Sequence, residues 1–273
     1  RINAGVCVSP HKFRNSVFQG IGYKGRWMVM TSINSLARAR ASGDAAIAIF
    51  NETHSSPIAE LRQAQSLRLR RRQALLSGGS DSVFFVRSGV IAVESAPLGS
   101  NRSIVEILYP GDIIAPGLVT ALPDVTYIAM TATEVSRTSL ASLQRDMASN
   151  AELSDFVVRQ LTKQRARMQL HISMLAGLSS EQRVAGLLLQ AAYRLGTASG
   201  ANVSFEMPLS RNEIAEYLAL NADTLSRIMS RLVRENVLQR SGRARMTVRD
   251  MTALGAHCPM SGAVSALHAQ PSL

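Results

Sequence analysis

The sequence predicts an α+β protein with an antiparallel β-roll, one long helix and a compact helical unit that ends in a hairpin. Three observations predict this order. Short apolar runs punctuated by Gly and Pro fill residues 57–148, apolar residues step by three and four along residues 149–176, and capped helices precede a basic hairpin in residues 177–250. Residues 1–56 and 251–273 are expected to be an extension and a tail. The 273 residues suffice for two domains that each bury a core.

The N-terminal extension, residues 1–56, is expected to be poorly ordered. The stretch before Met28 is basic and lacks the continuous apolar core and cleavage site of a signal peptide. We expect the natural start at Met28 or Met30. Residues 31–56 are rich in Ala, Ser and Asn, and Pro57 is a candidate boundary.

The β-roll prediction rests on short runs of β-branched and aromatic residues between turn signals. Val83–Val86 and Val90–Val93 flank Gly89, which supplies the turn of a hairpin. Ile104–Leu108 precedes a Pro-Gly-Asp turn, and residues 127–140 supply later strands. Such regular spacing is typical of an antiparallel roll or barrel.

The chain is strongly basic. Its formal net charge is +11 and its pI is about 10.7, and the segment from Ile58 to Arg72 is expected to be a short helix followed by a basic strand, RLRRRQAL. Positive charge supplies the sequence-independent part of nucleic-acid affinity, although a ribosomal or membrane-surface protein could carry the same charge. Aromatic residues make up 5%, which argues against stacking-based single-strand binders. No run of about 18 apolar residues exists, so we expect no membrane span.

Residues 149–176 predict a long helix with a heptad seam, the pattern of two helices wrapped together. A single amphipathic helix packed on its own barrel is the alternative. Polar residues at Gln164 and His171 would fix the register at some cost in stability, and a second interpretation makes His171 a sensor of pH or of a ligand. The seam residues, at spacings of four and three, are Val157, Leu161, Gln164, Met168, His171 and Leu175.

Three further helices and a hairpin are predicted after Gly177. A capping pair, Ser179 and Gln182, begins the first, and a capping box of Ser210 and Glu213 begins the second near residue 211. Asn221 can cap the third after a short turn. The core face of the first of these helices is Val184, Leu187, Leu188, Ala191 and Leu195. In the third, the apolar face is Leu225, Ile228, Met229, Leu232 and Val233, and the polar face is Asp223, Ser226, Arg227, Ser230 and Arg234.

A basic hairpin follows the third helix. Val237–Leu238 and Met246–Val248 are expected as short strands around Ser241–Gly242. A free polar helix face beside basic wings is what a DNA major groove accepts. For any single arginine a solvated surface charge is the alternative, but helix spacing, caps and wing agree with one another. The hairpin arginines are Arg240, Arg243, Arg245 and Arg249.

These residues carry a resemblance to the Crp/Fnr superfamily of bacterial transcription regulators. Leu209–Ala215 and Asn221–Arg227 match its helix-turn-helix, and the roll carries Phe-x-Val-x-x-Gly-x-Ile and Pro-Gly-Asp-Ile-Ile in the family order. The resemblance covers about residues 58–250. It implies a cyclic-nucleotide-binding-like roll, a dimerisation helix and a winged helix-turn-helix. Ala222 stands where cyclic-AMP-type members carry Arg, so the resemblance is to the Fnr/FixK-like branch.

The resemblance implies roles for three residues of the third helix. Fnr-like members carry Glu-x-x-Ser-Arg there, and this chain carries Asp223, Ser226 and Arg227. By resemblance Arg227 would read a guanine, Ser226 a thymine and Asp223 a cytosine amino group, on a half-site like TTGA. The Asp is one methylene shorter than the usual Glu. The expected phosphate contacts are Ser210, Arg211, Asn221, Thr224, Ser230, Arg231, Arg240, Arg243 and Arg245.

No cofactor is expected. Cyclic-AMP-binding members carry Gly-Glu and then an Arg pair, whereas this chain has Ala115-Pro116 and then Pro123-Asp124, whose carboxylate would repel a phosphate. An Fnr-type iron–sulfur cluster needs four cysteines, and the chain has only Cys7 and Cys258. Haem stays open, with His171 or His54 as axial ligand. For Cys258, a redox-switch thiol and a plain free cysteine are the alternatives.

The roll is not expected to be an enzyme. Residues 55–170 contain no His and no Cys, so a cupin-like metal site has no ligands there, and no Ser-His-Asp spacing stands out. The resemblance therefore implies a cytoplasmic, sequence-specific DNA-binding regulator that binds palindromic double-stranded DNA as a homodimer and contacts RNA polymerase. A small-molecule-binding or enzymatic roll with a vestigial DNA-binding module is the alternative. Control by amount and control by a bound ligand are both open.

Overall fold

The computed structural model describes residues 64–76, 81–96, 102–116, 125–242 and 244–269. The chain divides into two units, residues 1–51 and 52–273, and every described residue lies in the second. Several predictions fall outside the described residues. They are the order of residues 1–56, the starts at Met28 or Met30, the helix from Ile58, and the roles of Cys7, His54, Pro123, Asp124 and Arg243.

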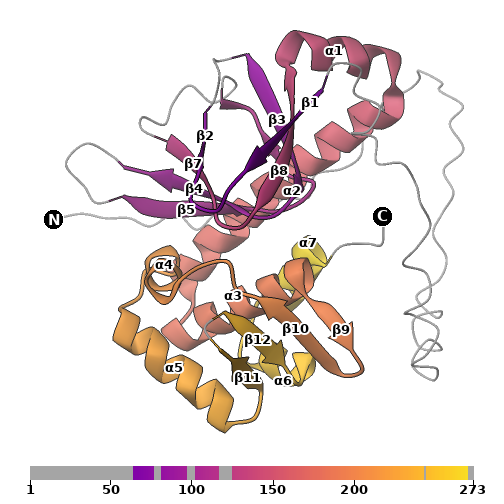
Figure 1. Cartoon of the computed structure of the whole chain (residues 1–273). Coiled ribbons are helices and arrows are strands. Elements are labelled where there is room, and N and C mark those ends of the chain that lie inside the picture. The colour runs from indigo at the N-terminus through magenta and orange to yellow at the C-terminus, as the bar shows by residue number, and fades with distance from the viewer. Residues whose placement is uncertain (1–63, 77–80, 97–101, 117–124, 243, 270–273) are drawn as a thin grey trace, which may run out of the picture. The chain divides into compact units, whose positions relative to one another are not determined.

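The first part of the second unit is an antiparallel roll, which confirms the fold class predicted for it. Its described strands form two four-stranded sheets with the orders β1-β8-β3-β6 and β2-β7-β4-β5 (Figure 1). Every pairing within the two sheets is antiparallel. The strands are β1 (Gln65–Leu69), β2 (Ala74–Leu75), β3 (Ser82–Ser88), β4 (Ile91–Ser95), β5 (Ser103–Leu108), β6 (Ile113–Ile114), β7 (Val125–Ala129) and β8 (Thr133–Ser139).

The apolar runs of the sequence fill the roll. Phe84, Val86 and Ile91 are wholly buried in one core cluster, and Gly89, with φ +84°, turns the chain between β3 and β4. The predicted hairpin is wrong, because β3 pairs with β6 and β8, whereas β4 pairs with β5 and β7 in the other sheet. A Cβ at Gly89 would lie 2.5 Å from the Ala132 carbonyl oxygen, so this position requires glycine.

The basic strand expected after the short helix is shorter than predicted. β1 ends at Leu69, and Arg70 to Gln73 form a turn in which Arg72 has φ +71°. The Gln73 side chain accepts from the Arg70 N–H at 2.9 Å, and this bond closes the turn. Residues 70–73 are all basic or polar, so they lack the alternation of apolar residues that a half-buried strand needs. Of the arginines in the predicted strand, only Arg68 therefore lies in β1.

Two helices leave the roll. Helix α1 (Leu140–Ser149) begins at the cap residue Ser139, and α2 (Ala151–Gly177) begins at Asn150, whose side chain accepts from the Leu153 N–H. The long helix predicted from the heptad pattern is therefore present as one continuous element. It passes diagonally from α1 to the C-terminal helices (Figure 1). None of the described helices is long and apolar enough to cross a membrane.

The C-terminal part is the predicted winged helix-turn-helix with additions. A four-stranded antiparallel sheet replaces the simple hairpin, because β9 and β10 join it. Two helices occupy the expected tail, and α7 packs on α3 and α2. The elements are α3 (Ser180–Leu195), β9 (Thr197–Ser199), β10 (Asn202–Glu206), α4 (Arg211–Tyr217), α5 (Ala222–Arg234), β11 (Leu238–Ser241), β12 (Arg245–Val248), α6 (Met251–Ala256) and α7 (Ser261–His268).

Candidate nucleic-acid interface

Helix α5 has one buried and one open face. Its buried residues are Leu225, Ile228, Met229 and Leu232, whereas Val233, predicted for the same face, is 40% exposed. Val233 lies in the last turn of the helix. Asn221 caps the helix, and its side chain accepts from the Asp223 N–H at 2.8 Å. The predicted apolar face is therefore buried at every position except Val233.

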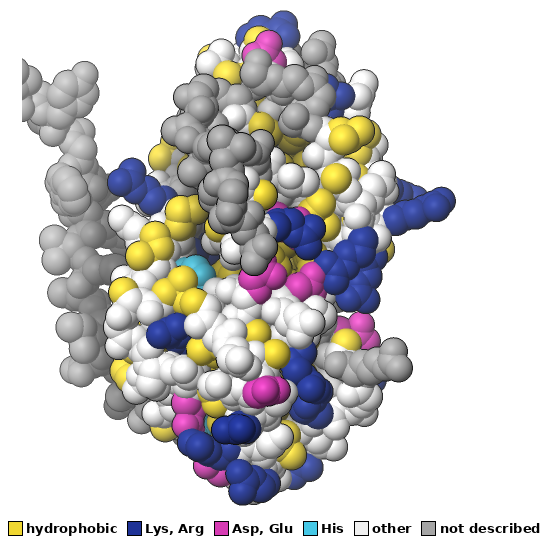
Figure 2. Space-filling view, turned by 90° about the vertical axis from the view of Figure 1, so that its left-hand side faces the viewer, with side chains coloured by type: hydrophobic (Ala, Val, Ile, Leu, Met, Phe, Trp, Pro, Cys, Tyr) yellow, Lys and Arg dark blue, Asp and Glu magenta, His cyan; other side chains and the backbone are white. Residues whose placement is uncertain are grey.

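The three candidate base-reading side chains lie on the open face. Asp223 and Arg227 are exposed and Ser226 is half-buried. Within the described residues, no ion pair engages Asp223 or Arg227. Their hydrogen-bonding groups are therefore available to a ligand. Figure 2 shows this side of the molecule, with Lys and Arg side chains over both its upper and its lower half.

Helix α4 is the first helix of the pair, and its predicted capping box is present. The Ser210 side chain accepts from the Glu213 N–H at 3.4 Å, and the Glu213 carboxylate accepts from the Ser210 N–H at 2.7 Å. The turn that follows passes through Ala219, which has φ +52°. The Arg183 side chain of α3 donates to the carbonyl of Leu218 at 3.0 Å, and this hydrogen bond stabilises the turn.

The predicted phosphate contacts differ in their exposure and in whether they already have a partner. Arg231 is paired with Glu181, and Arg245 lies 3.8 Å from Glu206, so these two arginines have intramolecular partners. Thr224 is half-buried, and Arg243 lies outside the described residues. The remaining five, all exposed, are Ser210, Arg211, Asn221, Ser230 and Arg240.

Helix α4 also contacts the roll. Arg72 forms an ion pair with Glu213, and the Glu216 carboxylate accepts from the Ile104 N–H at 3.0 Å. Burial alone would raise the pKa of Glu213, but the bonds from Arg72 and Ser210 outweigh it and hold that pKa below its usual value. No local pattern predicts these contacts, because their partners lie more than 100 residues apart in the sequence.

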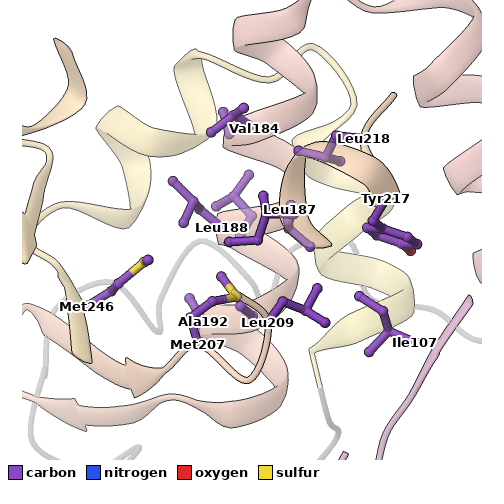
Figure 3. Packing of buried hydrophobic residues seen from close by; sticks show 14 of the residues in the cluster. Ile107, Val184, Leu187, Leu188, Ala192, Met207, Leu209, Tyr217, Leu218 and Met246 are labelled. Carbon is purple, nitrogen blue, oxygen red and sulfur yellow. The ribbon is translucent and has the colours of Figure 1, made fainter. Parts of the chain in front are cut away.

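An aromatic pair joins α2 to α4. The rings of His171 and Tyr217 are parallel, with centroids 4.0 Å apart, and Ile107 of β5 lies close to Tyr217 (Figure 3). The same apolar cluster includes Leu187 and Leu218, which pack α3 against α4. Burial lowers the pKa of His171 to about 4, so its ring is neutral near pH 7.

Three of the predicted seam residues face the chain itself, which corrects the seam. Val157 is buried in the core beside α1, and Gln164 makes two hydrogen bonds of 2.9 and 3.0 Å with the backbone of Ile113. His171 stacks on Tyr217. These residues attach α2 to its own roll and DNA-binding part, as the single-helix alternative expected for that face.

The outward stripe of α2 is displaced by one residue. Val158 is 57% exposed and Ile172 is 58% exposed, and along the helix they lie on either side of the exposed seam residues Leu161 and Met168. With Arg165, these positions keep the spacings of three and four. The predicted Leu161, Met168 and half-buried Leu175 stay in this corrected stripe. Adjacent apolar residues at 157 and 158 made both registers compatible with the sequence.

Stability is expected to fall as the pH drops from 6.5 toward 4, because His171 is buried neutral. The unfolded chain binds a proton in this window that the folded chain excludes, which costs at most about 1.4 kcal/mol per pH unit. His171→Phe keeps a stacked ring that cannot titrate, so urea denaturation at pH 5 and 6.5 should show a smaller difference. His268 and Glu106, which line the same pocket as His171, are present in both proteins. If the stability difference between pH 5 and pH 6.5 is the same in both proteins, the assignment of the pH dependence to His171 is contradicted.

A cavity of about 780 Å³ lies between the second sheet of the roll and α2. Its described lining is mostly apolar, and Glu106 and Arg165 are its charged residues. Burial and the neighbouring Asp112 raise the pKa of Glu106 to about 7. Ala115 and Pro116, which replace the Gly-Glu of cyclic-AMP-binding members, line this cavity and present no charge.

A buried charge cluster connects the roll to α2 and α3. Asp112, wholly buried, is paired with Arg167 and lies 3.7 Å from Arg194. Its carboxylate also accepts from the Tyr109 N–H at 2.9 Å, and the Arg194 guanidinium lies over the Tyr109 ring. The Pro-Gly-Asp turn, predicted only as a turn, thus anchors both helices.

Cys258 is buried at 1% exposure, against Gly186 and Met174. Burial raises the pKa of its thiol. A buried thiol with a raised pKa forms little thiolate, so the structure favours a plain core cysteine over a redox switch. Among the described residues, no group of three His, Cys, Asp or Glu could hold a metal ion.

Comparisons with known proteins agree with this geometry. Residues 182–256 match the Crp-like helix-turn-helix domain. The chain is 26% identical over 201 residues to the transcriptional activator protein FnrA of Stutzerimonas stutzeri, which covers 72% of this chain and 81% of FnrA. It is 28% identical over 207 residues to the nitrogen fixation regulation protein FixK of Bradyrhizobium diazoefficiens, which covers 71% of this chain and 84% of FixK.

The fold comparison points the same way. The structure of FixK2 from Bradyrhizobium japonicum superposes with a TM-score of 0.62 at 22% identity and covers 72% of this chain and 98% of FixK2. A CooA mutant from Carboxydothermus hydrogenoformans superposes with a TM-score of 0.59 at 22% identity, over 76% of this chain and 93% of CooA. The chain thus carries a Crp-like helix-turn-helix domain, and over about 70% of its length it is similar to transcription regulators of the Fnr/FixK branch of the Crp/Fnr superfamily.

Proposed function

We propose that this regulator binds palindromic double-stranded DNA as a homodimer and reads each half-site with Asp223, Ser226 and Arg227 of α5. The observation that carries the proposal is the open face of α5, on which the carboxylate and the guanidinium are exposed and unpaired by any described residue. Such a helix fits the major groove, where Arg pairs bidentately with guanine and a carboxylate accepts from the cytosine amino group. The capped and intact helix pair argues against a vestigial module.

The homodimer follows from the outward stripe of α2. Val158, Leu161, Met168 and Ile172 are apolar side chains that water covers in the single chain, and they follow a heptad repeat over about four helical turns. A second copy of the same helix would bury them. Two recognition helices related by a two-fold axis would then meet successive major grooves, and this requires a palindromic site.

Other parts of the proposal rest on the family alone. Relatives are named transcriptional activators, which supports RNA polymerase as a partner and the cytoplasm as the compartment. The regulator needs no chemistry of its own for this role, so we propose no enzymatic activity. The largely apolar cavity beside α2 fits a bound effector less charged than a cyclic nucleotide, whereas control by amount needs no ligand.

Selection of bound sequences from random duplex DNA with the purified protein tests the proposal. We expect a two-fold symmetric consensus with a TTGA-like half-site and with half-sites about one helical turn apart. Enrichment of sequences without two-fold symmetry would contradict the proposed homodimer. If no sequence is enriched, the proposed function as a whole is wrong.

Arg227→Ala is expected to weaken binding to the selected site by about 1–3 kcal/mol and to relax selectivity at one base position. The reason is the loss of a bidentate pair with one base. Arg240→Ala, on the exposed wing, is the matched control. It should weaken binding to every sequence alike and lower the salt slope by about 1. Titration of single-base variants of the site by fluorescence anisotropy would distinguish the two, and equal losses on all sequences for both proteins would contradict the division of roles.

A further inference from the structure

Helix α7 lies after residue 256, where the match to the Crp-like helix-turn-helix domain ends. It packs on both α2 and α3 (Figure 1). Two of its side chains, Val264 and His268, are only 1% and 4% exposed. They are four residues apart, so they lie on one face of the helix. This face is the buried side of α7.

The connection between α2 and α3 is short and receives little support from its own residues. Helix α2 ends at Gly177 and α3 begins at Ser180, so only Leu178 and Ser179 lie between the two helices. Gly177 is exposed, and a Cβ at this position would meet none of the described atoms within 4 Å. The Arg183 side chain donates to the Leu178 carbonyl at 2.9 Å, which ties the connection to α3 but not to α2. The angle between the two helices therefore depends on side chains that pack outside the connection.

The buried face of α7 provides such packing on both sides of the connection. Val264 and His268 line one cavity together with Leu170 and Met174 of α2 and Gln190 of α3. Val264, Leu170 and Met174 also belong to one buried apolar cluster. A single face of α7 therefore packs on residues that precede the connection and on residues that follow it.

The polar residue of this face lies beside the buried charge cluster. Burial, together with the charges of Arg167 and Arg194, lowers the pKa of His268 to about 3, so its ring is neutral near pH 7. The Nδ1 atom of His268 and the Nη1 atom of Arg167 are both buried without a hydrogen-bond partner among the described residues, and both side chains line the same cavity. A neutral imidazole nitrogen is an acceptor and a guanidinium N–H is a donor, so the two groups are complementary. Helix α7 thus faces α2 with a polar as well as an apolar side chain.

The angle between α2 and α3 determines where α5 lies in a homodimer. Helix α2 carries the outward stripe that would face the second copy, and α3 packs on α5 and β10 of the DNA-binding part. A dimer with two recognition helices requires half-sites at one separation. Successive base pairs are about 3.4 Å apart along the duplex, so a displacement of α5 by that distance changes the required separation by one base pair.

We propose that Val264 and His268 of α7 are positioning residues that set the half-site spacing which the homodimer accepts. They pack on α2 and α3 at once and so fix the angle between the dimer stripe and the DNA-binding part. The proposal rests on the proposed function, because spacing has a meaning only for a dimer that binds two half-sites. An angle fixed before binding reduces the entropy cost of docking both recognition helices. The affinity for a single half-site does not depend on that angle.

Two variants of the full chain release α7 in different ways. V264A/H268A removes both positioning side chains and leaves the backbone of α7 intact. Ala266→Pro breaks the helix at an exposed position, because proline has no N–H to donate and its ring clashes with the preceding turn. Ala266→Gln, at the same position, keeps the helix and is the matched control.

The test measures the Kd of each protein for duplexes that differ only in the distance between the half-sites. The set contains the selected palindrome, versions with one or two base pairs inserted or removed at its centre, and a duplex with a single half-site. We expect the wild type and Ala266→Gln to prefer the selected spacing by about tenfold or more, the factor that corresponds to the loss of one base contact. In both releasing variants this preference should fall to about threefold or less, while the Kd for the single half-site stays unchanged.

The single half-site separates a positioning role from a loss of stability. A variant that is merely destabilised loses affinity for every duplex alike, the half-site included, and this result in both releasing variants would overturn the proposal. An unchanged preference for the selected spacing in both variants would overturn it as well, as would a wild type that binds all spacings equally. Failure of the proposed function is a different result, because the wild type would then show no sequence-specific binding even to a single half-site.

Discussion

Replacing Asp112 by Asn is expected to lower the free energy of unfolding by about 3–5 kcal/mol. The carboxylate is wholly buried and compensates Arg167 and Arg194, which are themselves buried. The amide keeps the shape but removes the charge, so two guanidinium groups stay buried without a counter-ion. Urea denaturation at constant pH measures the change.

A matched control and a second variant make this test specific. Asp155 pairs with Arg159 on the exposed side of α2, and Asp155→Asn should change stability by less than about 1 kcal/mol, because solvent screens the pair. Adding Arg167→Met to Asp112→Asn should restore part of the loss, because one of the unpaired charges is removed. If Asp112→Asn stays within about 1 kcal/mol of the wild type, the cluster does not anchor the domains.

Ile172→Glu is expected to convert the proposed homodimer to a monomer. Ile172 is 58% exposed in the single chain and lies in the corrected α2 stripe, about one helical turn after Met168. Burying an Ile side chain fully contributes about 1.5–3 kcal/mol, and the symmetric interface contains it twice. The substitution also brings two carboxylates together across the two-fold axis. Analytical ultracentrifugation should show at least about a hundredfold increase in the dimer dissociation constant, since 2.8 kcal/mol corresponds to that factor.

Ser173→Glu is the control for this prediction. Ser173 is the next residue, also exposed, but about 100° away around the helix and outside the stripe. It should leave the dimer and its binding to palindromic DNA unchanged, whereas Ile172→Glu should bind the palindrome no better than a single half-site. A dimer that survives Ile172→Glu would mean that another surface forms it.

Local signals in the sequence were sufficient for much of the candidate site. The capping boxes at Ser179 and Ser210 depend on residues three apart, and both are present. Gly89 marked a turn, although not a hairpin, because its backbone conformation disfavours a side chain and β3 and β4 enter different sheets. The two faces of α5 followed from the period of 3.6 residues, and the wing followed from the turn at Gly242, which has φ +69°.

Other features depended on partners distant in the chain. The sheet that receives β9 and β10, and the docking of α7 on α2 and α3, had no signal at helical or strand spacing. The α2 seam was displaced by one residue because the periodicity could not say which of two adjacent apolar residues, Val157 or Val158, faces the roll. The hydrogen bonds between Gln164 and Ile113 settle the choice.

The sequence by itself determined the order of the elements, the caps that begin the helices and the polar face of α5, because each depends on residues within a turn or two of one another. Only the tertiary structure decided which side of α2 is open, which charge compensates Asp112, and that Arg72 of the roll pairs with Glu213 of α4. Such pairings depend on where the packed elements meet, and a linear pattern carries no information about distances between residues a hundred positions apart.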